Sequence, residues 1–140
     1  MVTHHIRLAV LALLGLLLAA CGEETGPWLA FEGGGFVVNY SGGYAASYYG
    51  FNVKPRRSLP AGTVLEAVFE APAGAPPFID RQEVKAPARR YSFRTPYIDG
   101  LEANHPYKAE IRVLEAGTKK LLASYTTTFT SKYDDAWLKK

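Results

Sequence analysis

Few residues of this 140-residue chain have side chains suited to catalysis or metal binding, and they are scattered. Cys21 is the only cysteine, and a lone thiol serves as a nucleophile, a ligand or a site of modification. His105 is the only histidine after Cys21, and it precedes Pro106 in a predicted turn. Asp134 and Asp135 offer far fewer oxygens than the six or more that Ca²⁺ takes. We therefore expect no catalytic residue, no metal site and no cofactor.

Sequence motifs of known catalytic classes are missing as well. The chain has no Gly-x-Ser-x-Gly elbow, no phosphate-binding loop and no His-Glu-x-x-His helix. The glycines at 33–35 lack the lysine of a phosphate cradle, and we predict a turn there. A hydrolase stays open as an alternative only if the fold brings carboxylates or a Ser/His pair together. The sequence favours a protein that is not an enzyme.

Tyrosine, serine and glycine dominate residues 40–51. These residue types are typical of binding loops, because tyrosine gives a large contact area at low entropic cost while serine and glycine adapt. We therefore treat Tyr44, Tyr48 and Tyr49 as candidate residues for binding a protein or glycan partner. The alternative is that alternate tyrosines pack inside the fold.

The elements that surround these residues begin with an apolar N-terminal segment. Arg7 is its only fixed positive charge, and 13 apolar or small residues follow at 8–20. That run is shorter than the roughly 20 residues of a membrane span and matches a secretory signal. An ordinary signal peptide cut after Ala20 would leave the free thiol of Cys21 in an oxidising compartment.

The residues Leu18-Ala19-Ala20-Cys21 resemble the lipobox of bacterial lipoprotein precursors. The resemblance implies cleavage before Cys21, a diacylglycerol on its thiol and acylation, for example with palmitate, of the new amino terminus. The membrane is then a partner through the lipid on Cys21. Gly22 stands where an Asp would signal inner-membrane retention in Gram-negative members. The resemblance therefore implies the outer membrane, facing the periplasm, if the organism is Gram-negative.

The chain divides into a signal helix at 1–20, a flexible lipidated tether at 21–30, a domain at 31–131 and a tail at 132–140. Cleavage leaves 120 residues, which is the size of one domain. Its 15 Lys and Arg face 13 Asp and Glu, so the formal charge of +2 gives no reason to expect nucleic acid as a partner. The tail is compatible with a short helix or a disordered end.

Alternating apolar and polar residues predict strands along the whole domain. Leu65, Ala67 and Phe69 share one face of a strand, and the residues at 107–114 alternate most clearly. The weak strand at 78–84 is expected at a sheet edge, and the last two strands form a hairpin. This spacing predicts an all-β antiparallel sandwich of about seven strands, at 36–40, 48–54, 63–70, 78–84, 90–95, 107–114 and 120–130.

Leu101 and Tyr107, six residues apart with Pro106 between them, resemble the tyrosine corner of immunoglobulin-like and fibronectin type III sandwiches. The resemblance implies that the Tyr107 phenol bonds to backbone near the preceding turn. The buried tryptophan of those domains has no counterpart, since Trp28 and Trp137 lie outside the predicted strands. The resemblance implies an immunoglobulin-like sandwich.

These observations together favour a membrane-anchored envelope lipoprotein that acts as a non-catalytic binding or structural accessory module. An inhibitor or immunity-type protein acting through an exposed loop at 71–77 is the alternative, and an envelope hydrolase is a third class. Eight cations offer a surface for anionic lipid or peptidoglycan, or else a solvated face partly cancelled by neighbouring carboxylates. They are Lys54, Arg56, Arg57, Arg81, Lys85, Arg89, Arg90 and Arg94.

Overall fold

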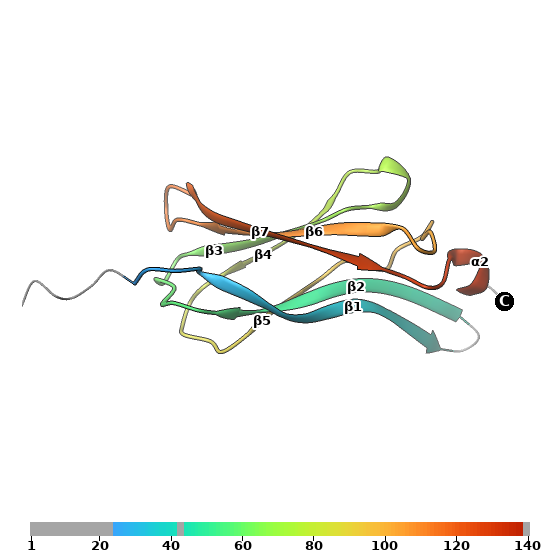
Figure 1. Ribbon diagram of the computed structural model, residues 1–140, viewed down its shortest axis with the longest axis horizontal. Coiled ribbons are helices and arrows are strands. Elements are labelled where there is room, and N and C mark those ends of the chain that lie inside the picture. Colours follow the sequence, from blue (N-terminus) through green and yellow to red (C-terminus); the bar gives the residue numbers. More distant parts are fainter. Residues whose placement is uncertain (1–23, 42–43, 139–140) are drawn as a thin grey trace, which may run out of the picture.

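The computed structural model places strands close to the predicted positions (Figure 1). It describes residues 24–41 and 44–138, so the predicted signal segment and Cys21 lie outside the described residues. The described part of the chain forms seven strands, one 3-10 turn and one short helix. They are β1 (Leu29–Ser41), β2 (Tyr44–Pro55), β3 (Val64–Phe69), the turn Pro72–Gly74, β4 (Phe78–Glu83), β5 (Tyr91–Arg94), β6 (Pro106–Leu114), β7 (Leu121–Thr130) and α2 (Asp135–Leu138).

The seven described strands form two antiparallel sheets packed face to face (Figure 1). One sheet has the order β1-β2-β5, and the other has the order β4-β3-β6-β7. This confirms the predicted antiparallel sandwich, with β4 at an edge and β6 and β7 paired as a hairpin. In constant-type immunoglobulin domains the fourth strand joins the sheet of the first two. Here β4 pairs with β3 instead, so the sheet that holds β1 and β2 has three strands and the other sheet has four.

The core lies between the sheets and is rich in aromatic rings. Tyr49 is fully buried near its centre, with its ring centroid 4.8 Å from that of Phe36 and 5.3 Å from that of Phe69. Burial of each large apolar side chain contributes about 1.5–3 kcal/mol, and without a disulfide this term has to carry the fold. The inward positions predicted for β3 and β6 are all buried: Leu65, Ala67, Phe69, Tyr107, Ala109, Ile111 and Val113.

β1 begins inside the segment that the sequence predicts as a tether. The strand starts at Leu29. The residue before it is already fixed, because the N–H of Trp28 donates to Tyr125 Oη at 2.8 Å. The carbonyl of Trp28 accepts from the N–H of Arg56 at 2.9 Å. The predicted tether at 21–30 is therefore too long, since these contacts attach the chain to both sheets by Trp28.

The turn predicted at Gly33, Gly34 and Gly35 is wrong, because all three pair with β2. A bulge between Phe31 and Gly33 shifts the register there. A Cβ on Gly34 would lie 2.7 Å from Cζ of Phe129, so glycine at this position lets β7 approach β1 closely. The glycines thus serve sheet packing and do not end the strand.

The tyrosine corner is present as its spacing predicts. Tyr107 and Leu101 are 1% and 3% exposed. The phenol oxygen of Tyr107 accepts a hydrogen bond from the N–H of Glu102 at 2.9 Å. This bond ties the loop before β6 to the strand itself.

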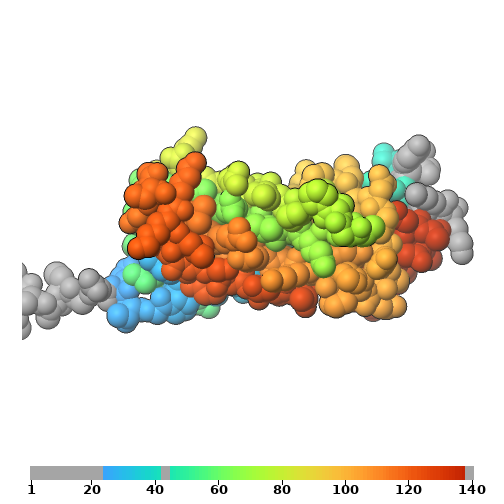
Figure 2. Space-filling view, turned by 90° about the horizontal axis from the view of Figure 1, so that it is seen from above, coloured from blue at the N-terminus to red at the C-terminus, as the bar shows by residue number. Residues whose placement is uncertain are grey.

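The C-terminal segment forms the short helix α2, one of the two predicted alternatives. Asp135 fastens this helix to the loop before β6, because its carboxylate accepts a hydrogen bond from the N–H of Leu101 at 3.1 Å. The backbone N–H of Asp135 also donates to the carbonyl of Leu101 at 3.2 Å. The ring of Trp137 stacks on Tyr133 with centroids 4.1 Å apart. The tail therefore covers the end of the sandwich opposite the start of β1 (Figures 1 and 2).

Charged side chains pair across the outer face of the four-stranded sheet, the side seen in Figure 2. Glu66 is only 6% exposed, and its carboxylate accepts from Arg81 Nε at 2.5 Å and Arg112 Nη1 at 3.1 Å. Arg112 also donates to Glu110 at 2.8 Å, which lowers the pKa of that carboxyl. Arginines from both neighbouring strands therefore compensate the carboxylate of Glu66 on the outer face of β3.

Candidate binding face

The adjacent tyrosines Tyr48 and Tyr49 lie on opposite faces of β2. Tyr49 is 0% exposed, its hydroxyl donates to the Glu70 carbonyl at 2.6 Å, and burial raises its pKa. The packing interpretation therefore applies to Tyr49, and its assignment as a partner-binding residue is wrong. Tyr48 is half-buried on the outer face. The side chain of Tyr44 lies outside the described residues.

A hollow of about 610 Å³ lies beside Tyr48 on the outer face of the three-stranded sheet. Gly35 of β1 pairs with Gly50 of β2, and together they form its floor. Two neighbouring positions of the sheet therefore lack side chains, while the flanking positions carry them. The hollow, called the glycine hollow below, is bounded by Val37, Tyr48, Asn52, Asp80, Ser92 and Arg94.

The backbone itself requires glycine on this floor. A Cβ on Gly50 would lie 2.3 Å from the carbonyl oxygen of Phe93, so any side chain would push β5 away. Gly35 has a φ of +150°, a conformation that other residues rarely adopt. A Cβ on Gly35 would meet no atom within 4 Å, so the space above this residue is open. The hollow is thus part of the sheet and does not depend on a mobile side chain.

One wall of the glycine hollow is aromatic and cationic. The guanidinium carbon of Arg94 lies 4.9 Å from the ring centroid of Tyr48. The ring of Tyr97 meets Tyr48 edge-on at 6.0 Å, and its hydroxyl accepts from Asn39 Nδ2 at 3.2 Å. These four side chains therefore form one continuous strip of ring, guanidinium and amide groups.

The other wall is polar. The hydroxyl of Ser92 donates to Asn52 Oδ1 at 2.6 Å, which fixes the direction of that amide. A carboxylate oxygen of Asp80 on β4 accepts from the backbone N–H of Arg94 at 3.4 Å. The hollow is therefore lined by hydrogen-bond acceptors and donors together with one aromatic ring, which is suited to binding hydroxyl groups.

Of the residues considered for catalysis or metal binding, Cys21 lies outside the described part of the chain, and His105 takes part in packing. His105 Nε2 lies 3.3 Å from Glu70 Oε2, and its ring packs edge-on against Tyr107 with centroids 4.5 Å apart. His105 therefore supports the tyrosine corner. Within residues 24–41 and 44–138, no three His, Cys, Asp or Glu side chains are grouped to hold a metal ion.

The glycine hollow itself does not follow from the sequence patterns. Gly35 and Gly50 are 15 positions apart, and the pattern around the first of them predicts a turn. A usable signal lies in the alternation of Tyr49, Phe51 and Val53, which places Gly50 and Asn52 on the outer face. The partner glycine follows only from the register between β1 and β2.

Comparison with models of known protein families and with curated proteins finds no match to this chain. Among the residues that the structure describes, no helix has the length and apolar character needed to cross a membrane.

Proposed function

We propose that this protein is a lipid-anchored, non-catalytic binding module of the bacterial cell envelope that binds a glycan in the glycine hollow. The observation that carries the proposal is the bare floor of Gly35 and Gly50 beside the ring of Tyr48. Sandwich folds serve many functions, so the proposal depends on this site and not on the fold.

The lipid anchor is proposed from the lipobox residues Leu18-Ala19-Ala20-Cys21. The chain has no second cysteine with which Cys21 could form a disulfide. Each acyl chain contributes about 0.8 kcal/mol per buried CH₂, so two or more chains hold a protein on a bilayer durably. The outer membrane, facing the periplasm, is the proposed location in a Gram-negative cell.

A glycan fits the glycine hollow better than a protein partner does. Sugar rings carry C–H faces that pack on aromatic rings and hydroxyl groups that both donate and accept hydrogen bonds. Tyr48 supplies the ring, Arg94 and Asn52 supply donors, and Asp80 supplies acceptors. The volume of about 610 Å³ lies within the usual range for small-molecule sites. Hot spots of protein interfaces also use tyrosine and arginine, so the choice of a glycan depends on the concave shape of the hollow and on its polar wall of Asn52, Asp80 and Ser92.

Calorimetric titration with soluble peptidoglycan fragments and with lipopolysaccharide core oligosaccharides tests the glycan site. We expect Tyr48→Ala and Arg94→Gln to weaken binding about tenfold each, equivalent to about 1.4 kcal/mol. Ile79→Ala is the matched control, because Ile79 is 51% exposed on the opposite sheet. Failure of the wild type to bind either glycan, or equal loss in the control, would contradict the glycan assignment.

The anchor is tested separately by feeding cells with labelled palmitate. Label should enter the wild type and be absent from Cys21→Ser. Equal labelling of both proteins would contradict lipid attachment at Cys21.

A second candidate function is supported by the loop at 71–77, which projects from the sandwich (Figure 1, yellow-green). Ala71 and Pro72 are buried at its base, while residues 73–77 are exposed. The N–H of Ala75 donates to the carbonyl of Pro72 at 3.2 Å and closes the turn. An inhibitor or immunity-type protein needs such a fixed, protruding loop.

A photo-crosslinker at Ala75 tests this second function, with the same group at exposed Lys132 as control. Capture of one envelope enzyme only at position 75, with inhibition of that enzyme by the wild type and not by Ala75→Arg, would support inhibition. Equal capture at both positions would contradict it.

A further inference from the structure

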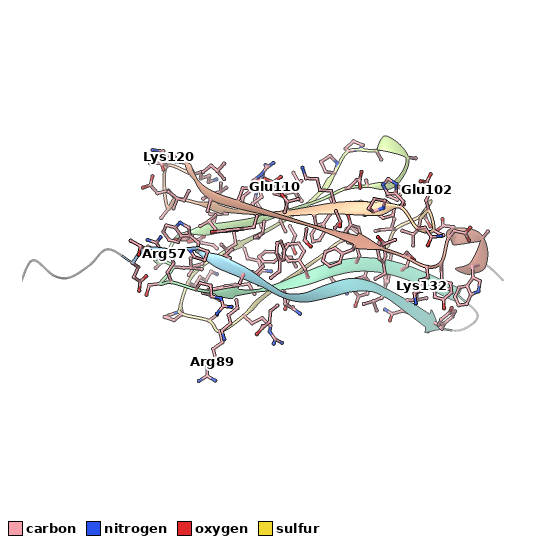
Figure 3. The ribbon with its side chains drawn as sticks, viewed as in Figure 1. Arg57, Arg89, Glu102, Glu110, Lys120 and Lys132 are labelled. Atoms are coloured by element: carbon pink, nitrogen blue, oxygen red, sulfur yellow. The ribbon has the colours of Figure 1, made fainter. Side chains whose placement is uncertain are left out.

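Cationic side chains gather at the end of the sandwich where the N-terminal segment leaves it (Figure 3). Arg57 lies beside the start of β1, and Arg89 projects below it at the same end of the sandwich (Figure 3). The cations line two adjoining hollows, which share Pro55 and Ala88. We call this surface the basic end, and its cations are Lys54, Arg56, Arg57, Arg89 and Arg90.

The basic end keeps an excess of positive charge after its ion pairs are counted. Glu32 pairs with Arg90 at 2.6 Å, and the hydrogen bond from Arg90, together with the charges of Lys54 and Arg56, lowers the pKa of Glu32. The carboxylate of Glu24 accepts from the Ser58 N–H at 2.8 Å. These two carboxylates face five cations, and the nearby β6–β7 turn adds Lys119 and Lys120 against Glu115.

Among the described residues, carboxylates outnumber basic side chains at the opposite end of the molecule. Asp99, Glu102, Asp134 and Asp135 all belong to the loop before β6 and the C-terminal segment. Lys132 is the cation labelled at this end in Figure 3. Among the described residues, the excess of cations therefore lies at one end of the long axis.

The first contacts that the described part of the chain makes with the domain lie at the basic end. The first is the hydrogen bond that the Glu24 carboxylate accepts from the Ser58 N–H. The Gly26 carbonyl then accepts from Arg57 Nη1 at 3.4 Å. The guanidinium of Arg57 also lies 3.9 Å from the ring centroid of Trp28. Cys21 is three residues before Glu24. Three residues span roughly 10–11 Å at most. A lipid on Cys21 therefore keeps Glu24, where the contacts of the basic end begin, within about 10–11 Å of the bilayer surface, a distance comparable to the Debye length of about 8–10 Å.

We propose that the basic end docks on the anionic lipid headgroups of the membrane that holds Cys21. The inference rests on the proposed lipid anchor, and it adds an orientation that the anchor alone does not impose. The basic end meets the negative surface, and the end that carries α2 points away from it. The glycine hollow then lies on the side of an upright domain, open to the surrounding space.

Amide hydrogen exchange on reconstituted protein tests this docking. The lipidated protein is purified in detergent, its acyl mass is verified by mass spectrometry, and it is placed in two kinds of vesicle. One kind is phosphatidylcholine alone, and the other is three parts phosphatidylcholine to one part phosphatidylglycerol. We expect slower exchange at residues 85–90 on the anionic vesicles only, and unchanged exchange at residues 99–105 at the far end.

Charge variants separate docking from anchoring. Each basic residue near an anionic surface favours contact about fivefold, so R56Q/R89Q should lower the ratio of docked to undocked protein roughly 30-fold. Both side chains are exposed, so the fold should be unaffected. K108Q/K132Q removes two exposed cations outside the basic end and should keep the protection.

The possible results have distinct meanings. Absence of the acyl mass refutes the anchor and the orientation that rests on it. With the acyl mass present, equal exchange on both vesicles, or protection retained in R56Q/R89Q, overturns docking alone. Protection by soluble peptidoglycan fragments and not by anionic vesicles assigns the basic end to a glycan and also overturns docking.

Discussion

Substitution of the neighbouring tyrosines Tyr48 and Tyr49 should have opposite consequences for stability and binding. Tyr49 is fully buried and contacts four other aromatic rings of the core. Replacing a large buried aromatic side chain by alanine costs about 3–5 kcal/mol. A small domain is stable by roughly 5–15 kcal/mol, so Tyr49→Ala removes a large share of the total.

Milder variants isolate the individual contributions. Tyr49→Phe keeps the ring and removes the hydroxyl that donates to the Glu70 carbonyl at 2.6 Å, which should cost about 1 kcal/mol. Tyr48→Ala removes the ring beside Arg94 on the outer face, and the lost cation–π contact is worth about 0.5–1 kcal/mol. Only Tyr48→Ala should impair glycan binding, because Tyr49 has no surface in the glycine hollow.

Urea unfolding followed by near-ultraviolet circular dichroism measures the free energy of unfolding, and calorimetric titration measures binding. The reasoning is refuted if Tyr48→Ala destabilises the domain as strongly as Tyr49→Ala. It is also refuted if the stable variant Tyr49→Phe loses glycan binding while Tyr48→Ala keeps it.

Three further predictions concern the corner, the core and the outer ion pairs. Tyr107→Phe should lower the free energy of unfolding in urea by about 1–3 kcal/mol, because the Glu102 N–H loses its acceptor. Burial raises the pKa of Tyr49 and Tyr107, so these phenols lose their protons in the unfolded chain at a lower pH than in the folded domain. The free energy of unfolding should therefore fall above pH about 10, by up to about 1.4 kcal/mol per pH unit for each tyrosine. The hydrogen bond from Arg112 lowers the pKa of Glu110, so the ionised carboxylate stabilises the fold above its ordinary pKa. This contribution to the free energy of unfolding should be lost as pH falls below about 4.5.

Matched measurements check each of these three outcomes. A Tyr107→Phe protein as stable as the wild type would contradict a stabilising role for the hydrogen bond of the tyrosine corner. Unfolding curves that do not change between pH about 9 and 11 would contradict the effect of tyrosine burial. The decrease in the free energy of unfolding at acidic pH should be smaller in Glu110→Gln. The same dependence of stability on pH in that variant and the wild type would contradict the role of Glu110.

Most of the sandwich is predictable because its signals are local. The alternation at 107–114 places Tyr107 and Ile111 inward, and both are buried. The tyrosine corner depends on a six-residue spacing from Leu101, so it too can be recognised within a short window. Turn residues and period-two alternation together are sufficient for the count of strands.

Residues near the N-terminus of the domain show where local signals fail. Glycine normally weakens a strand, so Gly33, Gly34 and Gly35 predict a turn. In the structure they remain in β1 because Phe129 of β7 lies against Gly34 and leaves no space for a side chain. That contact joins positions 95 residues apart, which a local pattern does not contain.

By itself, the sequence determined the class of fold and the strand faces of the core, whereas the resemblance of the residues before Cys21 to a lipobox and the attachment of lipid stay predictions. Only the tertiary structure decided that Gly35 lies opposite Gly50 and that Arg94 from a third strand reaches the ring of Tyr48. It alone also gathered the cations of the basic end. The physical reason is that alternation reports which face of a strand is buried, whereas register and packing arise from hydrogen bonds and contacts between segments far apart in the chain.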